Sequence, residues 1–149
     1  MVDVEAVRAS PKGIAGTGAL LAEAWNRYGI PLAITEVHLG CTVDEQIRWF
    51  VESWKAAMQA RRDGVHCIAL TAWAMLGSHY WNELVTSENG YYEPGIFDVR
   101  SGELMATELA QVVAEIAGGR EPRHSALTQS GWWRQSNRLC YPHSREQAA

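Results

Sequence analysis

Glu36 and His38 are the first residues of the sequence whose types and placement could do chemistry. They follow the short apolar run 31–35, which has the composition of a buried strand. Polar side chains at the carboxyl ends of parallel strands build the active sites of α/β barrels. Because side chains alternate along a strand, Glu36 and His38 are expected on the same side.

Aromatic residues follow a second apolar run at the corresponding place. The run 65–73 has strand character and ends at a tryptophan, and His79, Tyr80 and Trp81 come within the next eight residues. Ring faces cover the C–H surfaces of sugars, while charged and polar groups meet the hydroxyls. A carboxylate so placed can also stabilise or attack an oxocarbenium-like centre. The pattern therefore predicts sugar binding or glycosyl chemistry, with Glu36 as the reactive group.

Each of these residues also has an ordinary structural interpretation. A Glu that follows a strand most often caps a helix or lies in a solvated loop, and a single His there most often makes a loop hydrogen bond. Taken singly, Trp73 and Trp81 are expected to pack in the interior rather than to contact a ligand. Trp49 and Trp54 lie on or beside the apolar stripe of a helix, and both are assigned to packing. The functional hypothesis depends on the conjunction of carboxylate, imidazole and indoles.

The elements around these residues alternate between helix and strand. Apolar residues recur at helical spacing from Ala19 until Gly29 stops the pattern. A second helix is predicted after Thr42, which forms a capping box with Glu45, and a third is predicted over 102–119. Strand, helix, strand in this space indicates a right-handed parallel crossover. Two such strands cannot close on themselves, so the chain is expected to be part of a larger α/β structure.

Composition excludes several classes of protein. The 149 residues suffice for one domain, and the net charge of −4 argues against a nucleic-acid surface and an anionic membrane. No run has the length of a membrane span, and the N-terminus does not resemble a signal peptide. The three cysteines are widely spaced and odd in number, which favours a reducing, cytoplasmic setting: Cys41, Cys67 and Cys140.

No cofactor or metal site is predicted. Glycines 13, 16 and 18 do not have the dinucleotide-binding spacing. Cys41 lies near His38, but nothing in the sequence orients the pair as a thiol nucleophile. The remaining candidate ligands do not form a metal-binding pattern: Glu36, His38, His66, His79 and Asp98.

Three segments resemble family 1 glycoside hydrolases, the β-glucosidase group. PLAITEVHLG resembles the segment of the seventh barrel strand, where a Thr-Glu pair supplies the nucleophile. GVHCIALTAWAMLGSHYW resembles the eighth strand and its loop, in which two tryptophans have the spacing of Trp73 and Trp81. YEPGIFDVRSG resembles the return segment before the last helix, so the resemblance runs over about 19–118.

A closer resemblance is to a bacterial group in which such a barrel is fused to a dTDP-4-dehydrorhamnose reductase-like domain. It is carried by DVEAVR, PLAITEVHLGC, EQIRWF, YEPGIFDVR and GWWR. The resemblance implies an α/β fold, about the last two βα units of a TIM (β/α)8 barrel, incomplete as a standalone chain. Residues 1–119 would be barrel, and 120–149 a linker or tail with an aromatic anchor at 131–133. The isolated chain would expose strand edges and is expected to aggregate or oligomerise.

The resemblance also implies roles for individual residues. Glu36 matches the nucleophile. The residues it implies at the substrate are His38, Trp73, His79, Tyr80 and Trp81. Two positions depart from the family: Val37 and His38 replace Asn and Gly, and Tyr80 replaces a substrate-binding Glu.

The family's acid/base Glu belongs to the fourth strand, which this chain lacks. Nothing in the sequence supports Glu83, Glu88 or Glu93 as a substitute, so the chain alone is expected to be inactive. The expected partners are a carbohydrate, the remainder of the barrel and the reductase-like domain. The alternative is a non-catalytic barrel that binds a sugar or sugar nucleotide, or that only packs against the reductase-like domain.

Overall fold

The computed structural model describes residues 13–138, so the segment DVEAVR and Cys140 lie outside the described residues. The main body consists of helices α2 (Thr17–Tyr28), α3 (Val43–Arg62) and α4 (Glu108–Ala117) with strands β1 (Leu32–Val37) and β2 (Cys67–Ala72). The segment from β2 to α4 contains β3 (Ser78–His79), the 3-10 turn η1 (Trp81–Glu83), β4 (Tyr92–Glu93), β5 (Phe97–Asp98) and β6 (Met105–Ala106). The turns η2 (Ser125–Thr128), η3 (Trp132–Arg134) and η4 (Ser136–Arg138) follow α4.

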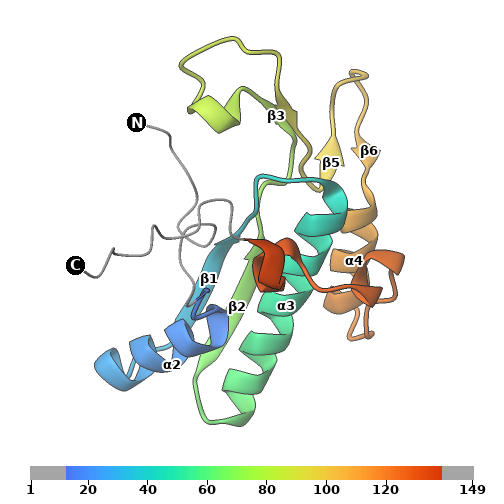
Figure 1. Ribbon diagram of the computed structural model, residues 1–149. Helices are drawn as coiled ribbons and strands as arrows, with labels where there is room; N and C mark the ends of the chain where they lie inside the picture. The colour runs from blue at the N-terminus through green and yellow to red at the C-terminus, as the bar shows by residue number, and fades with distance from the viewer. Residues whose placement is uncertain (1–12, 139–149) are drawn as a thin grey trace, which may run out of the picture.

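Strands β1 and β2 lie side by side and run parallel, joined by α3 (Figure 1). This confirms the predicted crossover. Within residues 13–138, neither strand has a second neighbour, so each keeps one free edge and no closed barrel is formed. Strands β3 and β4, and β5 and β6, form two small antiparallel ribbons beyond the carboxyl ends of the parallel pair.

The helices pack on one face of the β1–β2 pair. The apolar stripe of α3 is buried there, with Ile47 fully inaccessible, and Val112 of α4 completes the same cluster. Burying side chains of this size contributes about 2 kcal/mol each. Leu21 of α2 packs in a second cluster with Cys67 of β2. The other face of the pair is exposed and carries small residues: Ala33, Thr35, Ala69 and Thr71.

A bulge interrupts β1 before its last residue. Ile34 pairs with Leu70 and Val37 with Ala72, so three steps along β1 match two along β2. Ile34 and Val37 both pack toward the helices. Unbroken alternation from Ile34 would have turned Glu36 toward the helices as well. The bulge places Glu36 on the exposed side instead, which is a common use of bulges near functional sites.

Two predicted helix boundaries have different outcomes. α2 ends at Gly29, whose φ of 61° suits glycine and whose N–H donates to the Trp25 carbonyl at 2.9 Å, as the sequence predicts. α3 does begin after Thr42, but the Thr42 side chain makes no capping hydrogen bond. The capping-box prediction is therefore wrong. Glu45 instead accepts from Arg48 at 2.7 Å and from the Trp132 N–H at 3.4 Å.

The segment after α4 packs along α3 (Figure 1). Trp133 is 3% exposed, donates its indole N–H to Glu52 at 3.0 Å and meets Trp49 edge to face at 5.0 Å. Arg48 donates to the carbonyl of Ala126 at 2.7 Å. The predicted barrel–tail boundary at 119 stays a prediction, but the indole at 133 is buried against the helix.

None of the helices within residues 13–138 combines the length and the apolar character needed to cross a membrane.

Candidate functional site

The candidate site lies where β1 and β2 end. The Trp73 N–H donates to the Val37 carbonyl at 3.1 Å, which extends the ladder by one residue on β2. Glu36 therefore comes one residue before the last pair, and His38 and Trp73 come directly after it. Glu36 lies inside β1 rather than beyond its end, because the strand runs on to Val37 where the sequence predicts it to stop at residue 35. Figure 1 shows both strands reaching this edge together.

Three of the predicted residues form one aromatic group. The His38 ring meets Trp73 edge to face at 4.8 Å, and Trp73 lies 5.0 Å from Trp81 with the indole planes tilted by 43°. Trp81 is 37% exposed. The Trp73–Ala74 peptide bond is cis. The tryptophan spacing noted in the sequence thus corresponds to two indoles in contact, with one of them open to solvent.

His38 is held on both sides by oxygen acceptors. Its Nε2 lies 2.8 Å from a carboxylate oxygen of Glu93, and its Nδ1 lies 3.4 Å from the Trp73 carbonyl. The side chain of Glu93 is 7% exposed. Gly40 lies against the Glu93 carboxylate, since a Cβ at this position would lie 3.1 Å from the carboxylate oxygen that does not contact His38. Sequence reasoning considered Glu93 only as a possible acid, because nothing local links it to a histidine far earlier in the chain.

His79 and Tyr80 form a separate group. The His79 ring lies 4.8 Å from Tyr92 and 5.4 Å from Tyr80. Tyr80 has a positive φ of 62°, and its carbonyl accepts from the N–H groups of Glu83 and Val85, so it begins the tight turn that carries η1. Within residues 13–138 no ring contact joins this group to Trp73. The structure therefore does not bring all the predicted substrate-binding residues into one cluster.

Glu36 is exposed and makes no hydrogen bond or ion pair with any residue in the range 13–138. It borders a groove of about 400 Å³ that runs along the free edge of β1 against α2. The groove wall is otherwise mainly apolar, with Leu20, Leu21 and Ile34 among its residues. An unpaired carboxylate at this edge is available to a ligand or to a neighbouring segment.

Two ionisable groups near the site are displaced from their ordinary behaviour. Burial, and then the negative charges of Glu93 and Cys41, raise the pKa of Tyr91. Hydrogen bonds from Arg100 hold the pKa of the Asp98 carboxyl well below its usual range. Both groups lie in the segment between β2 and α4. The Asp98–Arg100 ion pair stabilises the turn that follows β5 on the surface.

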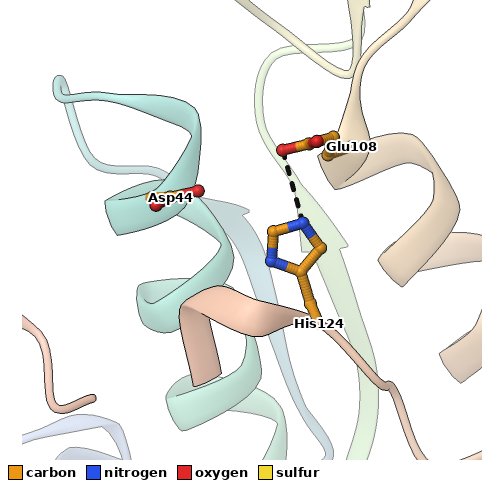
Figure 2. A group of neighbouring side chains, drawn as sticks. All are labelled: Asp44, Glu108 and His124. Carbon is orange, nitrogen blue, oxygen red and sulfur yellow. Dashed lines mark ion pairs between the residues drawn. The ribbon is translucent and has the colours of Figure 1, made fainter. Parts of the chain in front are cut away.

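Outside this site, one further group has the composition of a metal centre (Figure 2). Asp44, Glu108 and His124 each offer a ligand atom, and these atoms lie within 4.8 Å of one another. His124 Nε2 lies 3.3 Å from Glu108, while His124 Nδ1 accepts from the Ala126 N–H at 3.1 Å. Because Nδ1 is an acceptor, the proton of the neutral ring belongs on Nε2, the nitrogen that a metal would need.

Helix electrostatics point the same way. Asp44 and Glu108 lie in the first turns of α3 and α4, where the helix dipole favours anions and disfavours cations. The His124–Glu108 contact therefore links η2 to α4, and Asp44 of α3 lies beside this pair. Sequence reasoning missed it because its members come from three separate segments of the chain.

The comparisons with known proteins place this fold. No protein-family model matches the chain, and no curated protein matches it either. Among solved structures, a β-glycosidase from Pyrococcus horikoshii superimposes with a TM-score of 0.61 at 23% identity, over 88% of this chain and 31% of that one. The β-glycosidase from the hyperthermophile Thermosphaera aggregans gives 0.59 at 19% identity, over 75% of this chain and 23% of that one.

The chain thus has the fold of a part of these glycosidase TIM barrels and spans less than a third of their length. The predicted partial barrel is confirmed at this level. The predicted attachment to a reductase-like domain has no support in these comparisons and rests on the sequence resemblance alone.

Proposed function

We propose that this chain is the nucleophile-bearing C-terminal segment of a retaining glycoside hydrolase of β-glucosidase type. The observation that carries the proposal is the bulge in β1, which leaves Glu36 exposed at the end of the strand where unbroken alternation from Ile34 would turn it inward. In the β1–β2 pairing, Glu36 and Trp73 flank the last matched pair of residues. Trp73 and Trp81 offer the aromatic surface that a sugar ring requires beside such a carboxylate.

The proposed reaction has two steps. The Glu36 carboxylate attacks the anomeric carbon as the glycosidic C–O bond breaks, and an acid from the remainder of the barrel protonates the leaving oxygen. Water, deprotonated by the same group, then cleaves the glycosyl ester and releases Glu36. The chain supplies only the nucleophile, so it is inactive alone.

The free strand edges support the need for a remainder. The groove along β1 has a helical wall from α2, and a second groove of about 470 Å³ along β2 has walls from α3 and α4. Each groove has a helix beside a strand edge whose backbone N–H and C=O groups have no partner strand within residues 13–138. Each groove therefore has room for one more strand, which would pair with the free edge. Neighbouring barrel strands of the same protein are the proposed occupants, which agrees with the small share of each glycosidase that the chain covers.

A non-catalytic, sugar-binding barrel is the second candidate, attached to a reductase-like domain as the sequence resemblance suggests. One observation favours it. His38, which departs from the family pattern, is engaged by Glu93 and the Trp73 carbonyl, and within residues 13–138 the rings of His79 and Tyr80 make no ring contact with the two indoles. Binding without hydrolysis would then use the indole surface alone.

The experiment that separates these candidates uses the complete protein and a panel of fluorogenic glycosides. Glu36→Gln is expected to lower kcat by at least about a thousandfold, because the nucleophile is lost. Glu88→Gln, an exposed carboxylate of the loop, is the matched control and keeps full activity. Azide added to Glu36→Ala should restore turnover and yield a glycosyl azide of inverted configuration.

Full activity in Glu36→Gln would refute the nucleophile. If no glycoside is hydrolysed by the unchanged protein, calorimetric titration with sugars and sugar nucleotides decides for or against the binding barrel.

A further inference from the structure

We infer that Glu93 is a positioning residue that fixes His38, and through it the indole of Trp73. The inference rests on the proposed function, in which Trp73 and Trp81 bind the sugar, and it identifies the residues that hold Trp73 in place. Glu93 reaches His38 Nε2 at 2.8 Å, and the His38 ring then packs edge to face on Trp73 at 4.8 Å. A carboxylate, an imidazole and an indole thus form one chain of contacts from β4 to the end of β2.

Glu93 is itself held rigidly. The carbonyl of the next residue, Pro94, accepts from the buried Gln46 side chain at 3.1 Å. Gly95, which follows Pro94, approaches the segment after β2 so closely that a Cβ would lie 2.6 Å from the Ala74 carbonyl. The Ile96 N–H donates to that same carbonyl at 2.9 Å. The segment that carries Glu93 is therefore clamped to both α3 and the residue after Trp73.

His38 has no free nitrogen for substrate chemistry. Oxygen acceptors face both ring nitrogens, Glu93 at Nε2 and the Trp73 carbonyl at Nδ1. The neutral ring carries one N–H, so it donates to one of these oxygens while the other oxygen lies against the second nitrogen. A general acid or base needs a nitrogen within reach of the substrate, and a sugar hydroxyl needs an open donor or acceptor. His38 is assigned to positioning, which revises the substrate-binding role that the sequence resemblance implied.

The role of this contact chain follows from the geometry of the two indoles. Trp81 is the more exposed of the pair, and Trp73 fixes its inner side at 5.0 Å. If the His38 ring rotates, Trp73 loses its edge contact and the angle between the indoles is no longer held. The affinity for a sugar then falls although no group that touches the sugar has changed.

The first test follows the indole directly in the complete protein labelled with 5-fluorotryptophan. Trp73→Phe identifies the fluorine signal of Trp73. Glu93→Gln is expected to shift or broaden that signal and to leave the signal of Trp133 unchanged, because Trp133 packs on Trp49 and donates to Glu52 of α3 rather than belonging to the His38 contacts. Asp98→Asn, which removes another loop carboxylate, is the control and should leave the Trp73 signal in place. An unchanged Trp73 signal in Glu93→Gln overturns the inference, whether or not any sugar binds.

The second test uses the unchanged protein, so it does not depend on how a variant folds. Diethyl pyrocarbonate modifies free imidazole nitrogens, and His66 and His79 are exposed. His38 is expected to react at least about tenfold more slowly than either, because an oxygen atom already faces each of its nitrogens. Equal rates would show that the ring is free and would overturn the assignment.

The third measurement is sugar affinity, and it separates this inference from the proposed function. In the Glu36→Gln background, Glu93→Gln and His38→Phe should each weaken sugar binding about tenfold, and together they should weaken it no further. Additive losses contradict the contact chain. If the unchanged protein binds no sugar, the proposed function fails, and the fluorine and modification tests still decide the role of Glu93.

Discussion

The buried indole of Trp133 is expected to be what holds the last described segment against α3. Replacing a buried tryptophan by alanine costs about 3–5 kcal/mol. Trp133 has the contacts that make such a loss large. It is 3% exposed, donates to Glu52 at 3.0 Å and packs edge to face on Trp49. The charge-assisted hydrogen bond accounts for about 1.5–3 kcal/mol of that total, and the aromatic pair for about 0.5–1.5 kcal/mol.

This loss is concentrated in a peripheral segment, so it should appear as local opening rather than as global unfolding. The assay is limited trypsin digestion of the complete protein, with mass spectrometry of cleavage after Arg134, whose side chain also binds Glu52. Every 1.4 kcal/mol raises the open population about tenfold, so Trp133→Ala should raise cleavage there by at least about a hundredfold. Trp81→Ala, at an exposed tryptophan of η1, should leave this cleavage unchanged.

Two intermediate variants sharpen the result. Trp133→Phe keeps an aromatic ring and removes only the N–H donor, so it should give a smaller rise in cleavage than alanine does. Glu52→Gln keeps an acceptor but removes the charge, so its rate of cleavage after Arg134 should be closer to that of the unchanged protein than the rate in Trp133→Ala. Cleavage after Arg134 at the unchanged rate in Trp133→Ala would refute the reasoning, since the segment would then be held by something other than the indole.

Two further predictions concern ionisation and metal. Since burial and negative charge raise the pKa of Tyr91, the folded protein disfavours its phenolate: the associated stability is complete below the ordinary tyrosine pKa and is lost as the pH rises through the raised value. Absorbance at 295 nm should show one tyrosine ionising late, and Glu93→Gln should bring it part of the way back; simultaneous ionisation of all tyrosines would contradict this. Added Zn²⁺ should leave the melting temperature unchanged, because His124 Nδ1 already accepts from Ala126. A zinc-dependent rise that His124→Gln abolishes would show that the group does bind metal.

The elements that depend on neighbouring residues are predicted by the sequence. Residues within a few positions of one another predict three features: the apolar stripe of α3, the two short apolar strands that α3 connects, and the end of α2 at Gly29. These features need no knowledge of the rest of the chain. They were enough to predict a parallel crossover in an incomplete α/β structure.

The features that shape the candidate site depend on distant partners, and the sequence did not reveal them. The bulge in β1 exists only in its register with β2, and therefore no pattern within 31–40 marks it. The pairing of His38 with Glu93 joins the residue after β1 to strand β4, across the whole crossover. Glu45 matched a capping motif locally, but Trp132 from the far end of the chain uses its carboxylate instead.

The extra residue in β1 has a consequence for changes in chain length. Removing Thr35 would leave Ile34, Glu36 and Val37 in simple two-step order, with both aliphatic side chains still facing the helices and the carboxylate still facing outward. This strand should thus keep its side chains on their present faces after a one-residue deletion, which in an ordinary strand would move every following side chain to the opposite face. An insertion at the same place would not keep them there. Natural length variants that have lost this residue would keep both the apolar interior and the Glu36 carboxylate, and would lose only the hydroxyl next to it.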